Sequence, residues 1–250
     1  MFFRDSQAMI ERSFKHILRN PEAVIMAIVV PSLVMFIFGT IFGGVADVYG
    51  FNFIDFIVPG VILQSGAQGL IFVGLNANSD KLKGITDRFK TMNISKSSLI
   101  IGSFAVGILV AMVSASAIFG IAIWMGFRPQ ANFLQWLTAY VVIALYGATL
   151  TSIFTFAGLW ARDAGSVSGI SMPFFLLPFF SSAFAPIETL PYWLQGFATH
   201  QPMNLIAVVM RNSLLGLPLG NEVYWAIVWC VALIVVLFIL SIRLYTRKRA

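Results

Sequence analysis

The class of fold follows from twenty consecutive uncharged residues at positions 223–242, which are VYWAIVWCVALIVVLFILSI. A helix needs about 20 mostly apolar residues to cross the hydrocarbon core of a bilayer, and this run has that length. A basic residue, Arg243, follows it directly. The run therefore predicts a membrane-spanning helix near the end of the chain.

Five more apolar runs of comparable length precede it, so that we expect six spans at 23–46, 56–79, 99–124, 135–160, 164–187 and 223–243. Prolines should kink or end the fifth span, at positions 173, 178 and 186. A seventh run, 189–210, is too polar and too interrupted to face lipid, because its freed backbone groups would need partners. Residues 188–220 are therefore expected to form an interfacial or re-entrant segment, with Trp193, Phe197, His200 and Asn204 at the outer interface, either closing an exit or forming an aromatic belt.

The composition of the whole chain supports a membrane protein. Hydrophobic residues make up 59% and charged residues 10% of the 250 positions, and the mean hydropathy is +0.88. A water-soluble domain of this length would need more charges on its surface. Because no repeat or Gly/Ser linker divides the chain, we predict a single all-α, polytopic membrane domain over 1–250.

The basic residues predict the orientation of the spans. With six spans, fourteen of the sixteen Lys and Arg residues fall on one face and only Arg128 and Arg211 on the other. Loops rich in Lys and Arg stay on the cytoplasmic side, so both termini are expected to be cytoplasmic. Because these charges lie at the ends of apolar runs rather than in one basic module, they indicate membrane orientation and not nucleic-acid binding.

Two cytoplasmic segments have helical patterns of apolar residues. Residues 1–20 place Ile10, Phe14 and Leu18 opposite charged residues, which predicts an amphipathic interfacial helix, either a plain anchor or a grip for a partner protein. In the loop 80–98, Ile85, Phe89 and Met92 lie at i, i+4 and i+7. This spacing fits an apolar ridge that enters a groove on a partner, and it also fits a charged loop that touches the bilayer surface.

Polar residues within the spans suggest a substrate path. Span two contains Gln64, Ser65 and Gln68, and the end of span five contains Phe174, Phe175, Phe179, Ser181 and Ser182. Polar groups are costly in lipid and tend to face a cavity or another helix, and an aromatic surface suits apolar or amphiphilic cargo. Alternatively, the glutamines bind neighbouring helices and the phenylalanines face lipid.

Small residues allow close helix packing at two places. Gly39 and Gly43 form a Gly-x-x-x-Gly pair on span one, and Ser103, Gly107, Ala111 and Ala115 form a stripe on span three. Either set could contact a second copy of the chain or pack helices within one subunit.

Several activities are disfavoured by what the sequence lacks. It has no Gly-x-x-x-x-Gly-Lys-Ser/Thr motif to hold ATP phosphates, and no Gly-x-Ser-x-Gly or His-Glu-x-x-His motif of a hydrolase. One cysteine and two distant histidines cannot form a metal cluster. A secondary transporter usually has charged residues at mid-membrane, and none is centred in these spans. That alternative and a membrane scaffold remain the rivals of the interpretation that follows.

Several short segments, in order along the chain, resemble the type-2 ABC transporter permeases, particularly the daunorubicin-resistance-like drug exporters. The similar segments are FIVPG at 56–60, GITDRFK at 84–90, NIS at 93–95, MPFFLLP at 172–178, SSAFAP at 181–186 and LPYWL at 190–194. Together they extend over nearly the whole chain.

The resemblance implies a permease subunit that exports a hydrophobic or amphiphilic substrate, such as a drug, lipid, glycolipid or peptide. It implies a dimer with itself or a related permease, in a bacterial plasma membrane, with one ATPase subunit bound to each protomer. ATP and Mg²⁺ would be held by that ATPase and no cofactor by this chain. The ATPase contact would be the loop residues Gly84, Ile85, Thr86, Asp87, Arg88, Phe89, Lys90 and Met92.

Overall fold

The computed structural model describes residues 11, 21–42, 47–48, 50–85 and 96–246. Apart from Glu11, the predicted amphipathic segment 1–20 lies outside these residues. The elements of the described chain are helices, joined by turns and loops, and one antiparallel pair of strands of two residues each. Its elements are α2 (Pro21–Phe42), β1 (Asp47–Val48), β2 (Phe51–Asn52), α3 (Phe53–Leu82), α5 (Lys96–Met125), α6 (Phe133–Trp160), α7 (Ala164–Leu176), η1 (Leu177–Phe180), η2 (Ile187–Thr189), α8 (Tyr192–His200), α9 (Pro202–Leu214) and α10 (Glu222–Thr246).

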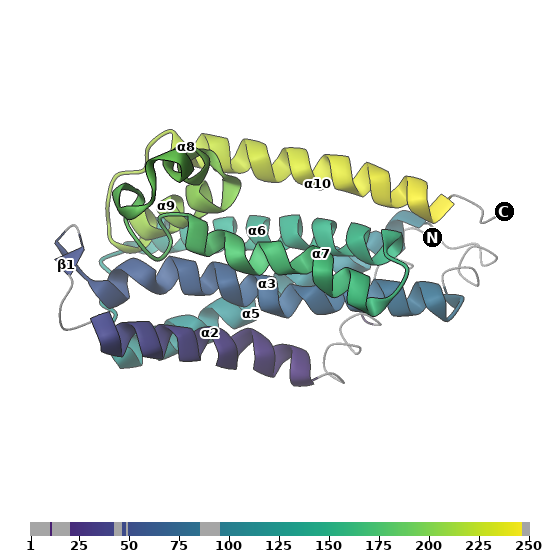
Figure 1. Ribbon diagram of the computed structural model, residues 1–250, viewed down its shortest axis with the longest axis horizontal. Helices are drawn as coiled ribbons and strands as arrows, with labels where there is room; N and C mark the ends of the chain where they lie inside the picture. The colour runs from purple at the N-terminus through teal and green to yellow at the C-terminus, as the bar shows by residue number, and fades with distance from the viewer. Residues whose placement is uncertain (1–10, 12–20, 43–46, 49, 86–95, 247–250) are drawn as a thin grey trace.

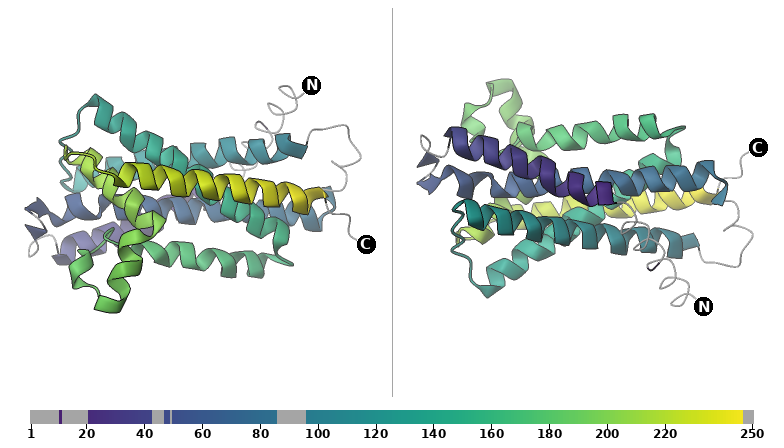
Figure 2. Two further views of the ribbon diagram at one scale, coloured as in Figure 1. Left: turned by 90° about the horizontal axis from the view of Figure 1, so that it is seen from above. Right: turned by 90° about the horizontal axis from the view of Figure 1, so that it is seen from below.

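The long helices form a bundle around α3 (Figure 1). In α3, 78% of the membrane-spanning residues are buried, against 17% in both α2 and α10. Figure 2 shows α2 and α10 on opposite sides of the bundle, with α3 between them. The outward faces of α2 and α10 carry Leu33, Phe36, Val235 and Ile239, all about half exposed. Such faces need a lipid cover, because water would solvate them poorly.

Five helices are long and apolar enough to cross a membrane, namely α2, α3, α5, α6 and α10. A sixth apolar stretch, Ala164–Phe180, is shorter. It consists of α7 and the 3-10 helix η1, and together they rise about 28 Å, close to the thickness of the hydrocarbon core. The fold is therefore the predicted polytopic helical membrane protein.

The fifth span is shorter than the predicted range 164–187. The α-helix ends at Leu176, and Pro178 follows at the start of η1. Proline has no N–H for the helical ladder and clashes with the preceding turn, which is why regular α-helix stops here. The chain then turns at Ser181, where the backbone is extended. Of the prolines predicted to kink or end this span, Pro178 follows the end of the α-helix and Pro173 lies within it.

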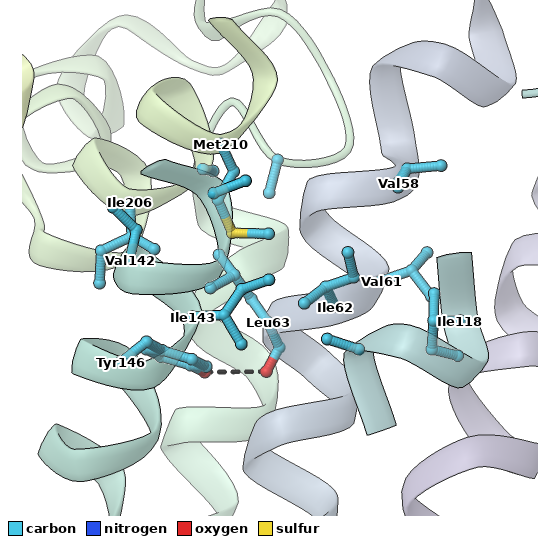
Figure 3. Packing of buried hydrophobic residues seen from close by; sticks show 14 of the residues in the cluster. Val58, Val61, Ile62, Leu63, Ile118, Val142, Ile143, Tyr146, Ile206 and Met210 are labelled. Atoms are coloured by element: carbon cyan, nitrogen blue, oxygen red, sulfur yellow. Dashed lines mark hydrogen bonds between the residues drawn. The ribbon is translucent and has the colours of Figure 1, made fainter. Parts of the chain in front are cut away.

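The two ends of the bundle differ, and they are named here by what lies at each. At the capped end lie α8, α9 and the β1–β2 pair (Figure 1). At the loop end, α3 and α6 end and α7 begins. Figure 3 shows Ile206 and Met210 of α9 facing the same apolar core as Val142 of α6 and Leu63 of α3. The predicted re-entrant segment therefore includes a helix that is packed into the bundle.

The small residues of α5 pack helices within the chain. A Cβ atom on Gly147 of α6 would lie 2.7 Å from the Cβ atom of Ala111, and Gly107 would meet the Thr151 side chain at even shorter range. Gly39 of α2 is buried against Met125 and Ile54, while Gly43 lies outside the described residues. Of the two alternatives that the sequence left open, these contacts favour packing within one subunit at Gly39, Gly107 and Ala111.

Candidate functional site

The predicted ATPase-coupling loop starts where α3 ends. The last turn of α3 closes with hydrogen bonds from Lys83 N to the Ser79 carbonyl (2.9 Å) and from Gly84 N to the Lys81 carbonyl (3.2 Å). Gly84 has a φ of +69°, in the left-handed region that glycine adopts without strain, so it terminates the helix. Gly84 and Ile85 are half-buried. Thr86, Asp87, Arg88, Phe89, Lys90 and Met92 lie outside the described residues.

The polar residues of α3 that were predicted to line a path differ in burial and in hydrogen bonding. Ser65 is fully buried and donates a hydrogen bond to the Ala27 carbonyl of α2 at 2.6 Å. Gln64 is also fully buried, and its amide oxygen and nitrogen make no hydrogen bond to the described part of the chain. Gln68 is half-buried. Ser65 therefore holds two helices together, whereas the Gln64 amide has no hydrogen-bond partner among the residues that the structure describes.

The phenylalanines near the end of span five pack mainly against one another and the bundle. Phe174 meets Phe154 of α6 edge-to-face, with ring centroids 5.7 Å apart. Phe179 stacks on Phe184 at 4.6 Å and meets the ring of Phe175 at 6.2 Å. These three predicted residues, Phe174, Phe175 and Phe179, are half-buried and form an aromatic strip along α7 and η1.

The two serines after η1 build the turn that leads away from span five. Ser181 donates to the Pro178 carbonyl at 2.7 Å and accepts from Ala183 N at 3.1 Å. Ser182 donates to Asn204 of α9 from its backbone N–H (2.8 Å) and from its hydroxyl (2.6 Å). Both serines are buried, and each hydroxyl donates a hydrogen bond within the protein. Asn204, which we expected at the outer interface, is buried here as well.

The centre of the capped end is Arg211 of α9, a residue that sequence analysis treated only as a charge in an outer loop. Its guanidinium donates to the Phe56 carbonyl of α3 from Nε (3.3 Å) and Nη2 (3.1 Å), and to the carbonyl and hydroxyl of Ser182. Its Cζ lies 3.9 Å from the centroid of the Phe56 ring. Arg211 is only 8% exposed. One side chain thus joins the start of α3, the turn after η1 and α9.

At the loop end, two polar side chains of α3 bind the end of α6. Asn78 Nδ2 donates to the carbonyls of Gly158 and Ala161, at 3.0 Å each, and Lys81 Nζ donates to the Ala161 carbonyl at 2.7 Å. The last carbonyls of a helix have no partner within it, and a positive charge there is favourable. This group, Asn78 and Lys81 with the two α6 carbonyls, is called the α3–α6 clamp below.

The sequence contains a pattern from which the role of Arg211 at the capped end could have been predicted, but none that predicts the clamp. Arg211 directly follows the apolar stretch LIAVVM at 205–210, where a charge is costly unless it is paired, and this is a sign of a buried, bonded position. By contrast, Asn78 and Lys81 look like solvated residues at the end of a span, because nothing nearby in the sequence shows that α6 ends beside them.

The surface of α8 is aromatic. Tyr192 and Trp193 are 91% and 79% exposed, and Phe197 is exposed as well. Trp225 of α10 is exposed at the same end. Tyr and Trp favour the boundary between hydrocarbon and headgroups, since their rings are apolar and their polar atoms can reach water. This arrangement fits the aromatic belt that was one of the two expectations for the segment.

Comparisons with known proteins agree with this architecture. Residues 4–215 match the family described as ABC-2 type transporter. The chain is 30% identical over 243 residues to the daunorubicin resistance ABC transporter permease protein DrrB1 of Streptomyces coeruleorubidus, covering 95% of this chain and 83% of that one. It is 25% identical over 219 residues to the probable doxorubicin resistance ABC transporter permease protein DrrC of Mycobacterium tuberculosis, covering 87% of this chain and 79% of that protein.

A third relative is more distant. The probable multidrug ABC transporter permease YbhR of Escherichia coli is 23% identical over 179 residues, which cover 70% of this chain and 47% of YbhR. The family match extends from residue 4 through α9, so it includes both the clamp and Arg211. The chain belongs to the ABC-2 type transporter family and is the membrane-spanning permease subunit of an ABC exporter.

Proposed function

We propose that this permease moves a hydrophobic or amphiphilic substrate out of the cytoplasm or the inner leaflet, driven by ATP hydrolysis on a separate ATPase that binds the loop 84–92. The observation that carries the proposal is the length and position of α3 in a chain of this family. α3 has 30 residues and rises about 45 Å, whereas the hydrocarbon core is about 30 Å thick. A helix of this length leaves about 15 Å outside the core, and in this proposal the excess is at its last turns, where it presents the loop to a soluble partner.

The loop end is the cytoplasmic side in this proposal. Exposed or half-buried Lys81, Lys83, Arg162 and Arg243 lie at that end among the described residues, and the capped end has Arg128 exposed and Arg211 buried. The bias of Lys and Arg toward the cytoplasm supports this orientation, in a bacterial plasma membrane. ATP and Mg²⁺ then stay on the ATPase, which approaches from the cytoplasm.

The substrate class follows from the chemistry of the predicted path. Gln64 offers an amide with unused hydrogen-bonding capacity on the buried helix, and the strip of Phe174, Phe175 and Phe179 offers apolar surface beside α3. An amphiphile has both a polar group for the amide and apolar surface for the rings. Two relatives are drug-resistance permeases by name, so an amphiphilic drug or a lipid is the favoured cargo. Gln68, Ser181 and Ser182 remain predicted parts of the path.

The complex is proposed to contain two permease subunits, identical or related, and two ATPase subunits. The exposed apolar faces of α2 and α10 give ample surface for a second subunit or for lipid. ATP-driven closure of the ATPases would push the two loops and open a path between the subunits.

The test is transport into inverted membrane vesicles that contain the permease and its ATPase, with daunorubicin and a fluorescent phospholipid as separate probes. We expect uptake of at least one probe that requires both ATP and Mg²⁺. Uptake that needs no ATP and collapses with a protonophore would favour a secondary transporter. No uptake of either probe from a complex that hydrolyses ATP would contradict the proposed substrate class.

A further inference from the structure

The α3–α6 clamp lies at the closest approach of two helix backbones. A Cβ atom on Gly74 would lie 2.6 Å from the Phe154 carbonyl oxygen, and one on Gly158 would lie even closer to the Gly74 carbonyl. Only glycine permits this contact, because any side chain would push the helices apart. Asn78 follows Gly74 by one turn on the same face and binds the Gly158 carbonyl. α3 and α6 are thus locked together next to the loop.

The orientation of the Asn78 amide is fixed by its partners. Both of its bonds go to carbonyl oxygens, which only accept, so the nitrogen must face α6. The amide oxygen is buried without a hydrogen bond in the described part of the chain. Both hydrogen bonds that Asn78 donates therefore go to the end of α6. The Lys81 ammonium donates a charge-assisted hydrogen bond to the Ala161 carbonyl.

On the α3 side, the clamp is continuous with the predicted ATPase contact. The helix runs unbroken from Asn78 through Lys81 to Leu82, and Gly84 opens the loop. A helix is stiff along its axis, because each residue is tied to the next turn by a hydrogen bond. A displacement of the helix end at Leu82 consequently moves Asn78 and Lys81 with it.

On the α6 side, the clamp is continuous with α7. α6 ends at Trp160 with Ala161 as its C-cap, and Asp163 caps α7 by accepting from Ser166 N at 2.8 Å. Only Val167 and Ser171 are buried within α7, so few of its side chains fix the helix, and the α6–α7 junction contributes to its position. The far end of α7 leads into η1 and the Ser182 turn held by Arg211.

We infer that Asn78 and Lys81 are positioning residues that transmit movement of the ATPase-binding loop to the α6–α7 junction and hence to α7. The inference rests on the proposed function, since it names how force from the ATPase enters the membrane. The clamp makes α3, the end of α6 and the start of α7 move as one body, and α7 carries the phenylalanine strip beside the predicted path.

The test measures two quantities in the same complex, the distance across the clamp and the amount of substrate transported per ATP hydrolysed. In a Cys230→Ser background, which has no cysteine, spin labels at Lys83→Cys and Arg162→Cys report the distance across the clamp, in nucleotide-free and vanadate-trapped complexes. We expect one narrow distance distribution that is the same in both states. Asn78→Asp, which replaces the donating amide nitrogen with an accepting oxygen, should broaden it and lower the substrate moved per ATP by about fivefold or more.

Three further variants separate a positioning role of the clamp from a role in folding. Lys81→Met should lower the transport-to-ATP ratio, and Lys81→Arg, which keeps a donor for the Ala161 carbonyl, should restore it. Asn76→Asp adds the same charge two residues earlier on α3, away from α6, and should leave distance and ratio unchanged. Should Asn78→Asp and Lys81→Met both keep the wild-type distribution and ratio in a complex that forms, the clamp has no role in coupling. If no complex with an ATPase forms at all, the proposed function fails and this inference fails with it.

Discussion

Single buried polar residues have different roles in this protein, depending on whether their hydrogen bonds are satisfied. Arg211 binds carbonyls on two other segments, whereas the Gln64 amide has no partner in the described chain. A satisfied buried polar group stabilises the fold, and an unsatisfied one lowers stability by about 1–3 kcal/mol. We expect the first kind to be structural and the second kind to be retained for function.

Gln64 gives the first prediction. Gln64→Leu keeps the side-chain volume and removes the unsatisfied amide, so it should raise the free energy of unfolding by about 1 kcal/mol. The same change should reduce ATP-driven uptake of an amphiphile, because it removes the polar group of the predicted path. Thermal unfolding and vesicle uptake measure the two effects. A variant that is less stable than the wild type, or that transports normally, would show that Gln64 is only a packing residue.

Arg211 gives the opposite prediction for stability. Arg211→Met leaves the Phe56 and Ser182 carbonyls without the guanidinium, and we expect unfolding to become easier by about 2–3 kcal/mol. The only cysteine, Cys230, is 1% exposed, so a thiol-reactive dye reports unfolding directly. Arg162→Met is the control for the loss of a guanidinium, since that side chain is exposed. Equal unfolding midpoints for the two variants would argue against the role of Arg211 in the capped end.

At the scale of elements, the apolar runs predicted where helices occur better than how they pack. The bilayer requires about 20 apolar residues per span, so spans such as 135–160 are evident from sequence. The packing of α9 into the bundle was not evident, because its polar residues, such as Asn204, find partners far away in sequence. Likewise, Ser181 and Ser182 look like a polar patch in sequence but serve a turn.

The start of α7 depends on the charge of Asp163. Its hydrogen bond from Ser166 N holds the pKa of Asp163 below the ordinary value of 3.8, because the ionised carboxylate is the better acceptor. The unfolded chain binds the proton more readily, so the cap contributes fully above the ordinary pKa and is lost as the pH falls through the lowered one. The protection of the Ser166 and Val167 amides, measured relative to the exchange rate of an unstructured chain at the same pH, should therefore fall below about pH 4.

Variants of Asp163 test this cap. Asp163→Ala should expose the same amides at every pH, whereas Asp163→Asn keeps an accepting oxygen and should make their protection independent of pH between about pH 3 and pH 6. If exchange in the Ala variant equals that of the wild type at neutral pH, the side chain does not cap α7.

The crossing of α3 and α6 depends on glycine. Gly74→Ala would place a Cβ atom 2.6 Å from the Phe154 carbonyl, so the helices must separate, and we expect a loss of about 1–3 kcal/mol of stability. Gly120→Ala is the matched control in α5, because a Cβ atom there meets nothing within 4 Å. It should be neutral or slightly stabilising, since alanine favours helix over glycine. Similar unfolding midpoints for both variants would contradict the close crossing.

For the whole molecule, α3 connects the two ends of the bundle. Its first turn is bound by Arg211 at the capped end, and its last turns form the clamp and lead to Gly84 at the loop end. The sequence indicated the membrane fold and, by resemblance, the family. It could not indicate that one buried helix joins the predicted ATPase contact to the start of α7, because that depends on which carbonyls lie beside Asn78.

The central claim is that this permease receives its energy through the loop that follows α3. The most direct measurement is co-purification of the tagged chain with candidate ATPases from its own genome, for the wild type, Phe89→Asp and Thr91→Asp. At helical spacing Thr91 lies about 130° around from the middle of the ridge of Ile85, Phe89 and Met92, so it is off the ridge and controls for the added charge. We predict that an ATPase accompanies the wild type and Thr91→Asp and is lost from folded Phe89→Asp. An ATPase retained by Phe89→Asp, or absent from the wild type, would contradict the claim.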